Sequence, residues 1–123
     1  MSYAALLAGV LAALTCLIHT FIGGREVARP LLSASDLETI PRLTSYYCWH
    51  LVTGTLALMS AGYFWLTWTF ETGLVWGLLG LSVIFAILPF AITLKQRVSL
   101  SVLPQWVFFL PLSGLSIAIL VGY

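Results

Sequence analysis

Four long stretches without a charged side chain constrain the fold of this chain more than any other feature. They cover residues 1–24, 43–70, 72–94 and 98–123. Each is longer than the ~20 residues that a helix needs to cross a hydrocarbon core of about 30 Å. Their apolar residues run continuously, whereas membrane strands alternate lipid-facing and lumen-facing positions. Since a helix also satisfies its own backbone groups in lipid, the pattern predicts transmembrane helices.

The composition excludes most other classes of protein. Charged residues make up 7% of the chain, against about 25% in a typical soluble domain. Disordered chains are rich in charge and poor in apolar residues, whereas 61% of this chain is hydrophobic. The net charge of +1 provides no basic surface for nucleic acid. We therefore expect an integral membrane protein whose first partner is the lipid bilayer and which binds no nucleic acid.

The expected architecture is an all-α, four-helix transmembrane bundle that forms a single domain over residues 1–123. The helices are predicted over about 3–22, 45–69, 73–94 and 100–122. A long loop over 23–44 joins the first two, and Gly23 and Gly24 at its start can end a helix in a left-handed cap. The first apolar stretch exceeds the roughly 7–15 residues of a signal-peptide core, so we expect a span there rather than a cleaved leader.

All five basic residues fall on one side of this bundle. Three lie in the loop over 23–44 and two lie between the third and fourth helices: Arg25, Arg29, Arg42, Lys95 and Arg97. Because basic residues accumulate in cytoplasmic loops, both termini are predicted on the non-cytoplasmic side. We expect a multi-pass integral membrane localisation, in the cytoplasmic or inner membrane if the source is bacterial.

Aromatic and small residues add two expectations about packing. Aromatic rings favour the membrane interface, and several are expected near the outer ends of the helices: Tyr3, Tyr63, Phe64, Trp65, Trp68, Phe70 and Tyr123. Small residues at regular spacing let helices approach closely in lipid. Three predicted helices carry such stripes: Ala5, Gly9 and Ala13; Gly73, Gly77 and Gly80; and Gly114, Ala118 and Gly122. The stripes predict close helix packing, within this chain or with another.

Two histidines near the charged side are the sharpest candidates for function. His19 and His50 fall at similar depth in the first and second predicted helices, which run in opposite directions, so their rings can face each other. Ionisable side chains within spans are costly and mark functional sites. Five further candidates for ligand contact or metal ligation lie around them: Cys16, Arg25, Glu26, Tyr46 and Gln105.

This cluster supports three chemical interpretations. Two histidines on facing helices can ligate a haem iron axially. His19, His50 and Cys16 together offer ligands for a transition metal such as copper or zinc. A pocket in which a histidine bonds a small amphipathic ligand is the third. Alternatively, the histidines are structural and hydrogen-bond a carbonyl or a lipid head group.

The sequence contains no motif that predicts an enzyme. No nucleophile with a partnered base occurs within the predicted spans, and no phosphate-binding, zinc-protease or calcium motif is present. We therefore predict a small polytopic membrane protein that acts as a non-enzymatic accessory or ligand-binding component, with a polar pocket in the cytoplasmic half of the bundle. The alternative is a haem- or metal-binding membrane redox protein using His19 and His50. A homo-oligomer or a larger membrane complex is expected in either case.

Overall fold

Helices account for nearly the whole chain, and no strand occurs in residues 1–122, the range that the computed structural model describes. The elements are α1 (Tyr3–Leu17), the π-helix η1 (Ile18–Ala28), α2 (Arg29–Ser33), α3 (Thr39–Trp65), α4 (Thr72–Gln96), the 3₁₀-helix η2 (Leu100–Val102) and α5 (Trp106–Val121). Because α1, η1 and α2 follow one another without a break, they form one helix over Tyr3–Ser33. The predicted all-helical fold with four helices is thus confirmed for this range. Tyr123, expected at the outer interface, lies outside the described residues.

The first helix is longer, and the loop after it shorter, than the sequence predicts. The expected loop over 23–44 is helical at both ends, and residues 34–38 alone lie outside a helix. No glycine in the described range has a positive φ, so Gly23 and Gly24 do not cap the helix but lie inside η1. Pro30 does not end the helix either: it lies in the first turn of α2, directly after the π-helical hydrogen bonding of η1 ends at Arg29.

The last helix begins later than expected. The predicted span over 100–122 is a 3₁₀ turn followed by α5, which starts at Trp106. Pro104 explains the late start, because the residue before a proline is driven out of the helical region. Leu103 accordingly has φ −126° and ψ 77°.

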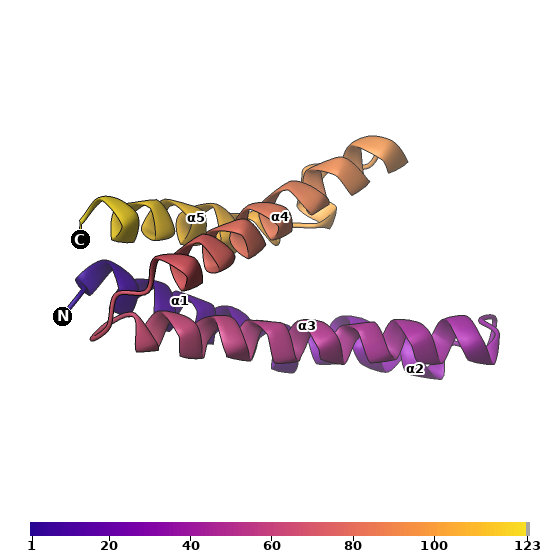
Figure 1. The fold of residues 1–123 in the computed structure, drawn as a ribbon. Coiled ribbons are helices and arrows are strands. Elements are labelled where there is room, and N and C mark those ends of the chain that lie inside the picture. The colour runs from indigo at the N-terminus through magenta and orange to yellow at the C-terminus, as the bar shows by residue number, and fades with distance from the viewer. Residues whose placement is uncertain (123) are drawn as a thin grey trace.

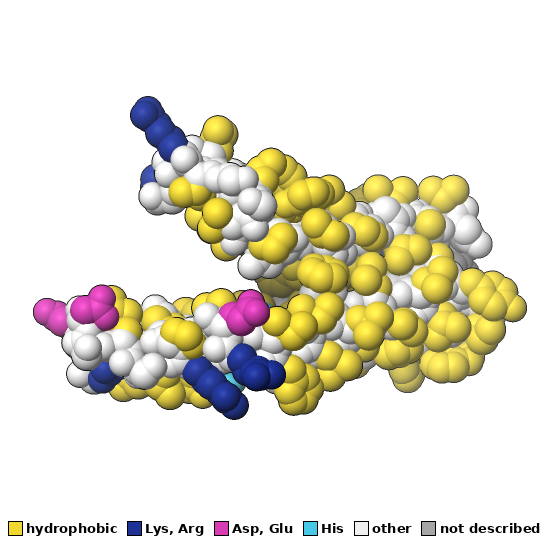
Figure 2. All heavy atoms as spheres, turned by 180° about the vertical axis from the view of Figure 1, so that it is seen from behind, with side chains coloured by type: hydrophobic (Ala, Val, Ile, Leu, Met, Phe, Trp, Pro, Cys, Tyr) yellow, Lys and Arg dark blue, Asp and Glu magenta, His cyan; other side chains and the backbone are white. Residues whose placement is uncertain are grey.

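The four helices form two antiparallel hairpins that diverge from a common packed end (Figure 1). The helix over Tyr3–Ser33 lies beside α3, and α4 lies beside α5. The hairpins meet where α1 packs on α5 and where α3 approaches the N-terminal part of α4. The N-terminus and the C-terminal end of α5 lie at this packed end. The basic side chains lie toward the other end, where the hairpins diverge (Figure 2).

Small residues of α1 let this helix pack closely against its neighbours. Ala5, Ala8 and Ala12 are fully buried along one face of this helix. Gly9 is buried on the same helix, and a Cβ at this position would lie 2.9 Å from the Phe64 ring on α3. The approach of α1 to α3 therefore needs a residue without a side chain at Gly9.

The other predicted glycine stripes are open. A Cβ at Gly73, Gly77, Gly80 or Gly114 would meet no atom within 4 Å. Gly73 and Gly77 line an apolar groove of about 450 Å³ between α3 and α4. These glycines therefore do not bring helices of this chain into close contact.

A buried hydroxyl cluster joins α3 to the second hairpin. The Tyr63 hydroxyl lies 2.7 Å from Ser116 Oγ on α5 and 3.2 Å from Ser82 Oγ on α4. Because Ser116 Oγ donates to the Leu112 carbonyl at 2.9 Å, Tyr63 is the donor to Ser116. Tyr63 lies in the last turn of α3 and is fully buried, so its ring packs inside the bundle, and its place near the outer membrane interface stays a prediction. The ring belongs to the core because its hydroxyl finds partners there.

Much of the molecular surface is apolar (Figure 2). Two helices, Tyr3–Ser33 and Thr72–Gln96, are long and apolar enough to span a membrane. Only 28% and 33% of their apolar windows are buried inside the molecule. Large side chains such as Leu7, Phe21 and Ile87 are more than half exposed.

Candidate ligand-binding site

The His19 ring is held by a tryptophan on the neighbouring helix. It stacks on the Trp49 indole with ring centroids 3.9 Å apart and an interplanar angle of 16°. His19 Nε2 also lies 3.3 Å from the Trp49 carbonyl oxygen, within hydrogen-bond distance. Because His19 belongs to η1 and Trp49 to α3, the two contacts connect these helices.

Gly23 makes room for the same tryptophan. A Cβ at Gly23 would lie 2.7 Å from Trp49 Cη2, whereas a Cβ at Gly24 would meet nothing within 4 Å. The helix is also wider here, because η1 has the hydrogen bonding of a π-helix, in which the Arg29 N–H reaches back to the Gly24 carbonyl. Trp49 thus contacts both the His19 ring and the Gly23 backbone.

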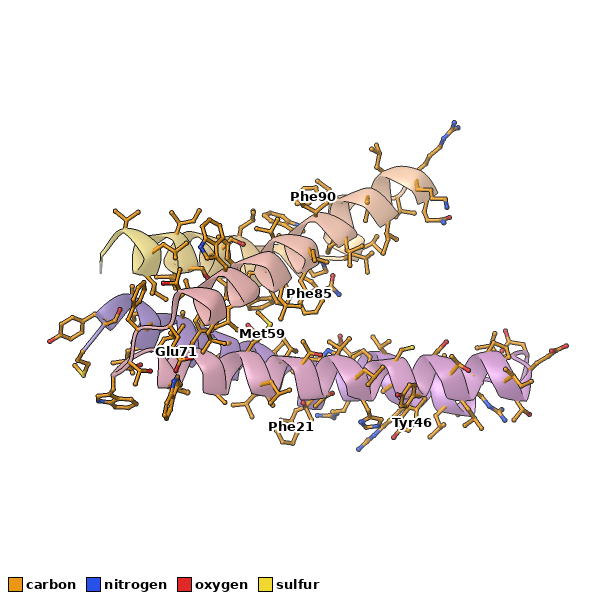
Figure 3. The ribbon with its side chains drawn as sticks, viewed as in Figure 1. Phe21, Tyr46, Met59, Glu71, Phe85 and Phe90 are labelled. Atoms are coloured by element: carbon orange, nitrogen blue, oxygen red, sulfur yellow. The ribbon has the colours of Figure 1, made fainter. Side chains whose placement is uncertain are left out.

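A groove of about 750 Å³ lies between the first helix and α3, next to this tryptophan. Its large apolar side chains include Phe21, Ile22 and Leu32, and its polar side chains are Thr20, Arg25, Glu26, Arg29, Tyr46, His50 and Thr53. Figure 3 shows Phe21 and Tyr46 on the side of this hairpin that faces away from α4. The groove therefore opens on the outer surface of the molecule and combines charged, neutral polar and apolar walls.

The groove carries three formal charges. Arg25 and Arg29 contribute two positive charges and Glu26 one negative charge, which leaves a net charge of +1 with His50 neutral. No ion pair forms among residues 1–122, so neither arginine has a carboxylate partner there. The His50 ring is exposed and meets the Tyr46 ring edge-on, with centroids 4.6 Å apart.

Four of the residues singled out in the sequence line this groove: Arg25, Glu26, Tyr46 and His50. The other candidates lie elsewhere. Gln105 is exposed at the start of α5, in the other hairpin. Cys16 Sγ lies 3.8 Å from the Thr53 carbonyl, to which it donates. His19 contacts Trp49, which lines the groove.

Sequence reasoning missed Trp49 as part of this site and did not pair Gly23 with it. The first helix was expected to end at residue 22, so the residues after it were assigned to a loop and not to a helix face. Trp49 lies between Cys48 and His50 in the sequence, and a large aromatic ring opposite a single glycine, here Gly23, is the signal that points to close helix approach.

No metal site is found among the described side chains. No group of three His, Cys, Asp or Glu side chains is placed there to hold a metal ion, and metal ligation by His19, His50 and Cys16 stays a prediction. A haem iron would have to compete with the Trp49 carbonyl for His19 Nε2.

The chemical capacity of the groove follows from its side chains. Guanidinium, hydroxyl and imidazole groups stand beside apolar surface, an arrangement suited to binding an amphipathic molecule.

Comparison with protein-family models, with curated proteins and with solved structures finds no match to this chain.

Proposed function

We propose that this chain is a multi-pass integral membrane protein that binds a small amphipathic ligand in the groove between the first helix and α3, as a non-enzymatic accessory component. The groove itself carries the proposal. Two arginines that have no carboxylate partner among residues 1–122 stand there beside exposed apolar side chains. A ligand with a polar head and an apolar body satisfies both kinds of wall at once.

The apolar surface supports insertion into a bilayer. Soluble proteins bury their most apolar helices, whereas both long apolar helices of this chain leave most of their apolar windows exposed. Lipid tails are as apolar as leucine side chains, so this exposure is favourable inside a bilayer. α3 and α5 pair with these two helices as hairpin partners, and we assign four spans on this basis.

The charge distribution supports one orientation. All the basic side chains lie toward the diverging end, opposite the N-terminus and the end of α5 (Figures 1 and 2). Under the positive-inside rule, the diverging end faces the cytoplasm and both termini face the other side. In a bacterium the chain would lie in the inner membrane. Arg25 and Arg29 then hold the groove at the level of the cytoplasmic head groups.

The open glycines support association with a further helix. Gly73 and Gly77 leave their backbone uncovered along the apolar groove between α3 and α4. Helices in lipid pack most closely where small residues expose the backbone. We assign this face to contact within a homo-oligomer or a larger membrane complex.

Photocrosslinking in intact membranes tests the ligand site. A benzophenone side chain is introduced in place of Tyr46, which lines the groove, or of Leu110, an exposed residue of α5 that serves as the control. After irradiation, the purified chain is examined by intact mass spectrometry. We expect one dominant small-molecule adduct at Tyr46 and the mixed adducts of bulk lipid at Leu110. The same mixture at both positions would overturn the proposed site.

A further inference from the structure

Arg25 and Arg29 form a pair of cationic groups on one wall of the groove. They are four residues apart on a continuous helix, and both line the groove. Neither has a carboxylate partner among residues 1–122. A guanidinium binds two phosphate oxygens through parallel hydrogen bonds, which makes arginine a preferred phosphate ligand. Two such groups side by side favour a ligand that carries a phosphate.

Uncharged donors in the same groove suit the rest of a head group. The hydroxyls of Thr20 and Tyr46 have no hydrogen-bond partner within the part of the chain that the structure describes. His50 is exposed beside Tyr46 and offers a ring nitrogen. Each of these groups can donate to a phosphate, ester or glycerol oxygen.

The net charge of the groove distinguishes between phosphate groups. Glu26 offsets one of the two arginines, which leaves a net charge of +1. A phosphodiester carries a single negative charge and balances this value. A phosphomonoester, at about −1.5 to −2, exceeds it. The groove therefore matches a phosphodiester best.

Apolar side chains continue from the arginines toward α1. Phe21 and Ile22 precede Arg25 by about one turn and are 64% and 52% exposed. Leu14 and Leu17 extend the exposed apolar surface along α1, with 49% and 52% of their surface uncovered. A ligand whose phosphate contacts the arginines therefore finds an apolar surface for long chains, in the direction of the bilayer centre.

We infer that the groove binds an acidic phospholipid of the surrounding bilayer, with its phosphodiester on Arg25 and Arg29 and its acyl chains along Phe21. This inference rests on the proposed function, because it names the ligand class of the same groove. Charge complementarity selects a lipid with one phosphodiester and no ammonium group. Basic sites at the cytoplasmic ends of membrane helices bind acidic head groups in this way.

Native mass spectrometry of the full chain in mild detergent tests the inference. Phosphatidylglycerol and phosphatidylcholine with the same acyl chains are added in equal amounts, and the bound lipid is counted for each. We expect the wild-type chain to prefer phosphatidylglycerol. In the double variant Arg25→Gln/Arg29→Gln, the ratio of bound phosphatidylglycerol to bound phosphatidylcholine is expected to fall by at least about tenfold. Equal binding of the two lipids by the wild-type chain would overturn the inference.

A matched control removes the same charge from the other hairpin. Lys95→Gln/Arg97→Gln deletes two basic side chains that do not line the groove, and we expect its preference for phosphatidylglycerol to equal that of the wild-type chain. An equal loss in this control would show diffuse charge attraction and contradict a defined site. Arg25→Lys/Arg29→Lys keeps the charge but not the bidentate geometry, so its preference should fall between those of the wild type and the glutamine variant. This variant keeps the test decisive if the glutamine variant does not fold.

Glu26 separates an acidic lipid from a zwitterionic one. Glu26→Gln raises the positive charge of the groove and should strengthen phosphatidylglycerol binding. If phosphatidylethanolamine is the ligand, its ammonium needs this carboxylate, and the same change would weaken binding. Preference for phosphatidylethanolamine would overturn the inference but keep the ligand site.

The photocrosslinking experiment separates the two proposals. A dominant Tyr46 adduct that is not an acidic lipid would overturn the inference and keep the site. If Tyr46 forms no specific adduct at all, the site itself is overturned.

Discussion

Trp49 on α3 stacks on His19 on η1, with ring centroids 3.9 Å apart. The stack joins η1 to α3, and the tip of the same indole lies where a side chain at Gly23 would be. Trp49 also lines the groove. The spacing of the two helices, and with it the width of the groove, therefore depends on this contact.

Gly23→Ala is expected to displace the Trp49 ring, because the new Cβ would lie 2.7 Å from Cη2. Gly24→Ala is the matched control, since its Cβ would meet no atom within 4 Å. We expect the Gly23 variant to be less stable than the Gly24 variant by about 1–3 kcal/mol, the usual magnitude of overpacking. It should also lose the specific adduct at Tyr46. Thermal unfolding in mild detergent measures the difference, and equal midpoints would contradict the tight contact.

His19→Phe is expected to preserve most of the stability, because a phenyl ring keeps the stack on Trp49 and loses only the 3.3 Å contact to its carbonyl. His19→Ala removes the ring and should destabilise the chain further, by about 0.5–1.5 kcal/mol for the aromatic pair. The optical spectrum of the purified protein gives an independent check. A Soret band that disappears when His19 or His50 is replaced by alanine would show haem ligation and contradict a structural role for His19.

The helical fold was predictable from charge spacing, because charged residues such as Lys95 and Arg97 mark the ends of apolar helices wherever a helix must lie in lipid. The extension of the first helix was not. The preference of glycine for helix ends is a local property, whereas Gly23 is needed here for contact with Trp49 on another helix. A tertiary contact of this kind overrides the local cap signal. It cannot be predicted from the residue pattern of the first helix alone.

The candidate site was partly predictable for a related reason. Polar side chains are so rare near the apolar stretches that Arg25 and His50 stood out, and both line the groove. Gln105 was grouped with them because its position near the start of the last predicted helix gives it a similar expected depth in the membrane. Membrane depth does not specify the hairpin to which a residue belongs, and the divergence of the two hairpins separates Gln105 from the groove.

Tyr63→Phe is expected to destabilise the packing of α3 on the second hairpin. The change deletes the hydroxyl that lies 2.7 Å from Ser116 Oγ and 3.2 Å from Ser82 Oγ, and it leaves buried Ser82 without this partner. The expected loss is roughly 0.6–2 kcal/mol, between the average for polar contacts in membrane helices and that for an unsatisfied buried group. Tyr47→Phe is the control, because the Tyr47 side chain is 62% exposed. Equal unfolding midpoints for the two variants would mean that the cluster contributes no stability.

In the proposed topology, in which α3 spans the membrane, α5 decides between four spans and three. It is 16 residues long, or about 24 Å at 1.5 Å per residue, against a hydrocarbon core of about 30 Å. The bilayer thins locally around a short span at modest cost, and residues 98–105, which carry no charge, lie just before the helix. We therefore predict that α5 crosses the membrane and that the end of the chain lies on the same side as the N-terminus.

Two reporters of opposite preference test this orientation. Alkaline phosphatase, which is active outside the cytoplasm, should be active when fused after residue 123 and inactive when inserted within 34–38. Green fluorescent protein fluoresces in the cytoplasm but does not fold after export through the general secretion route. It should therefore give the reverse pattern. Active phosphatase at both positions would contradict the position of the basic loop. A fluorescent, phosphatase-inactive C-terminus together with a cytoplasmic 34–38 loop would show that α5 does not cross, because three spans put the two ends of the chain on opposite sides.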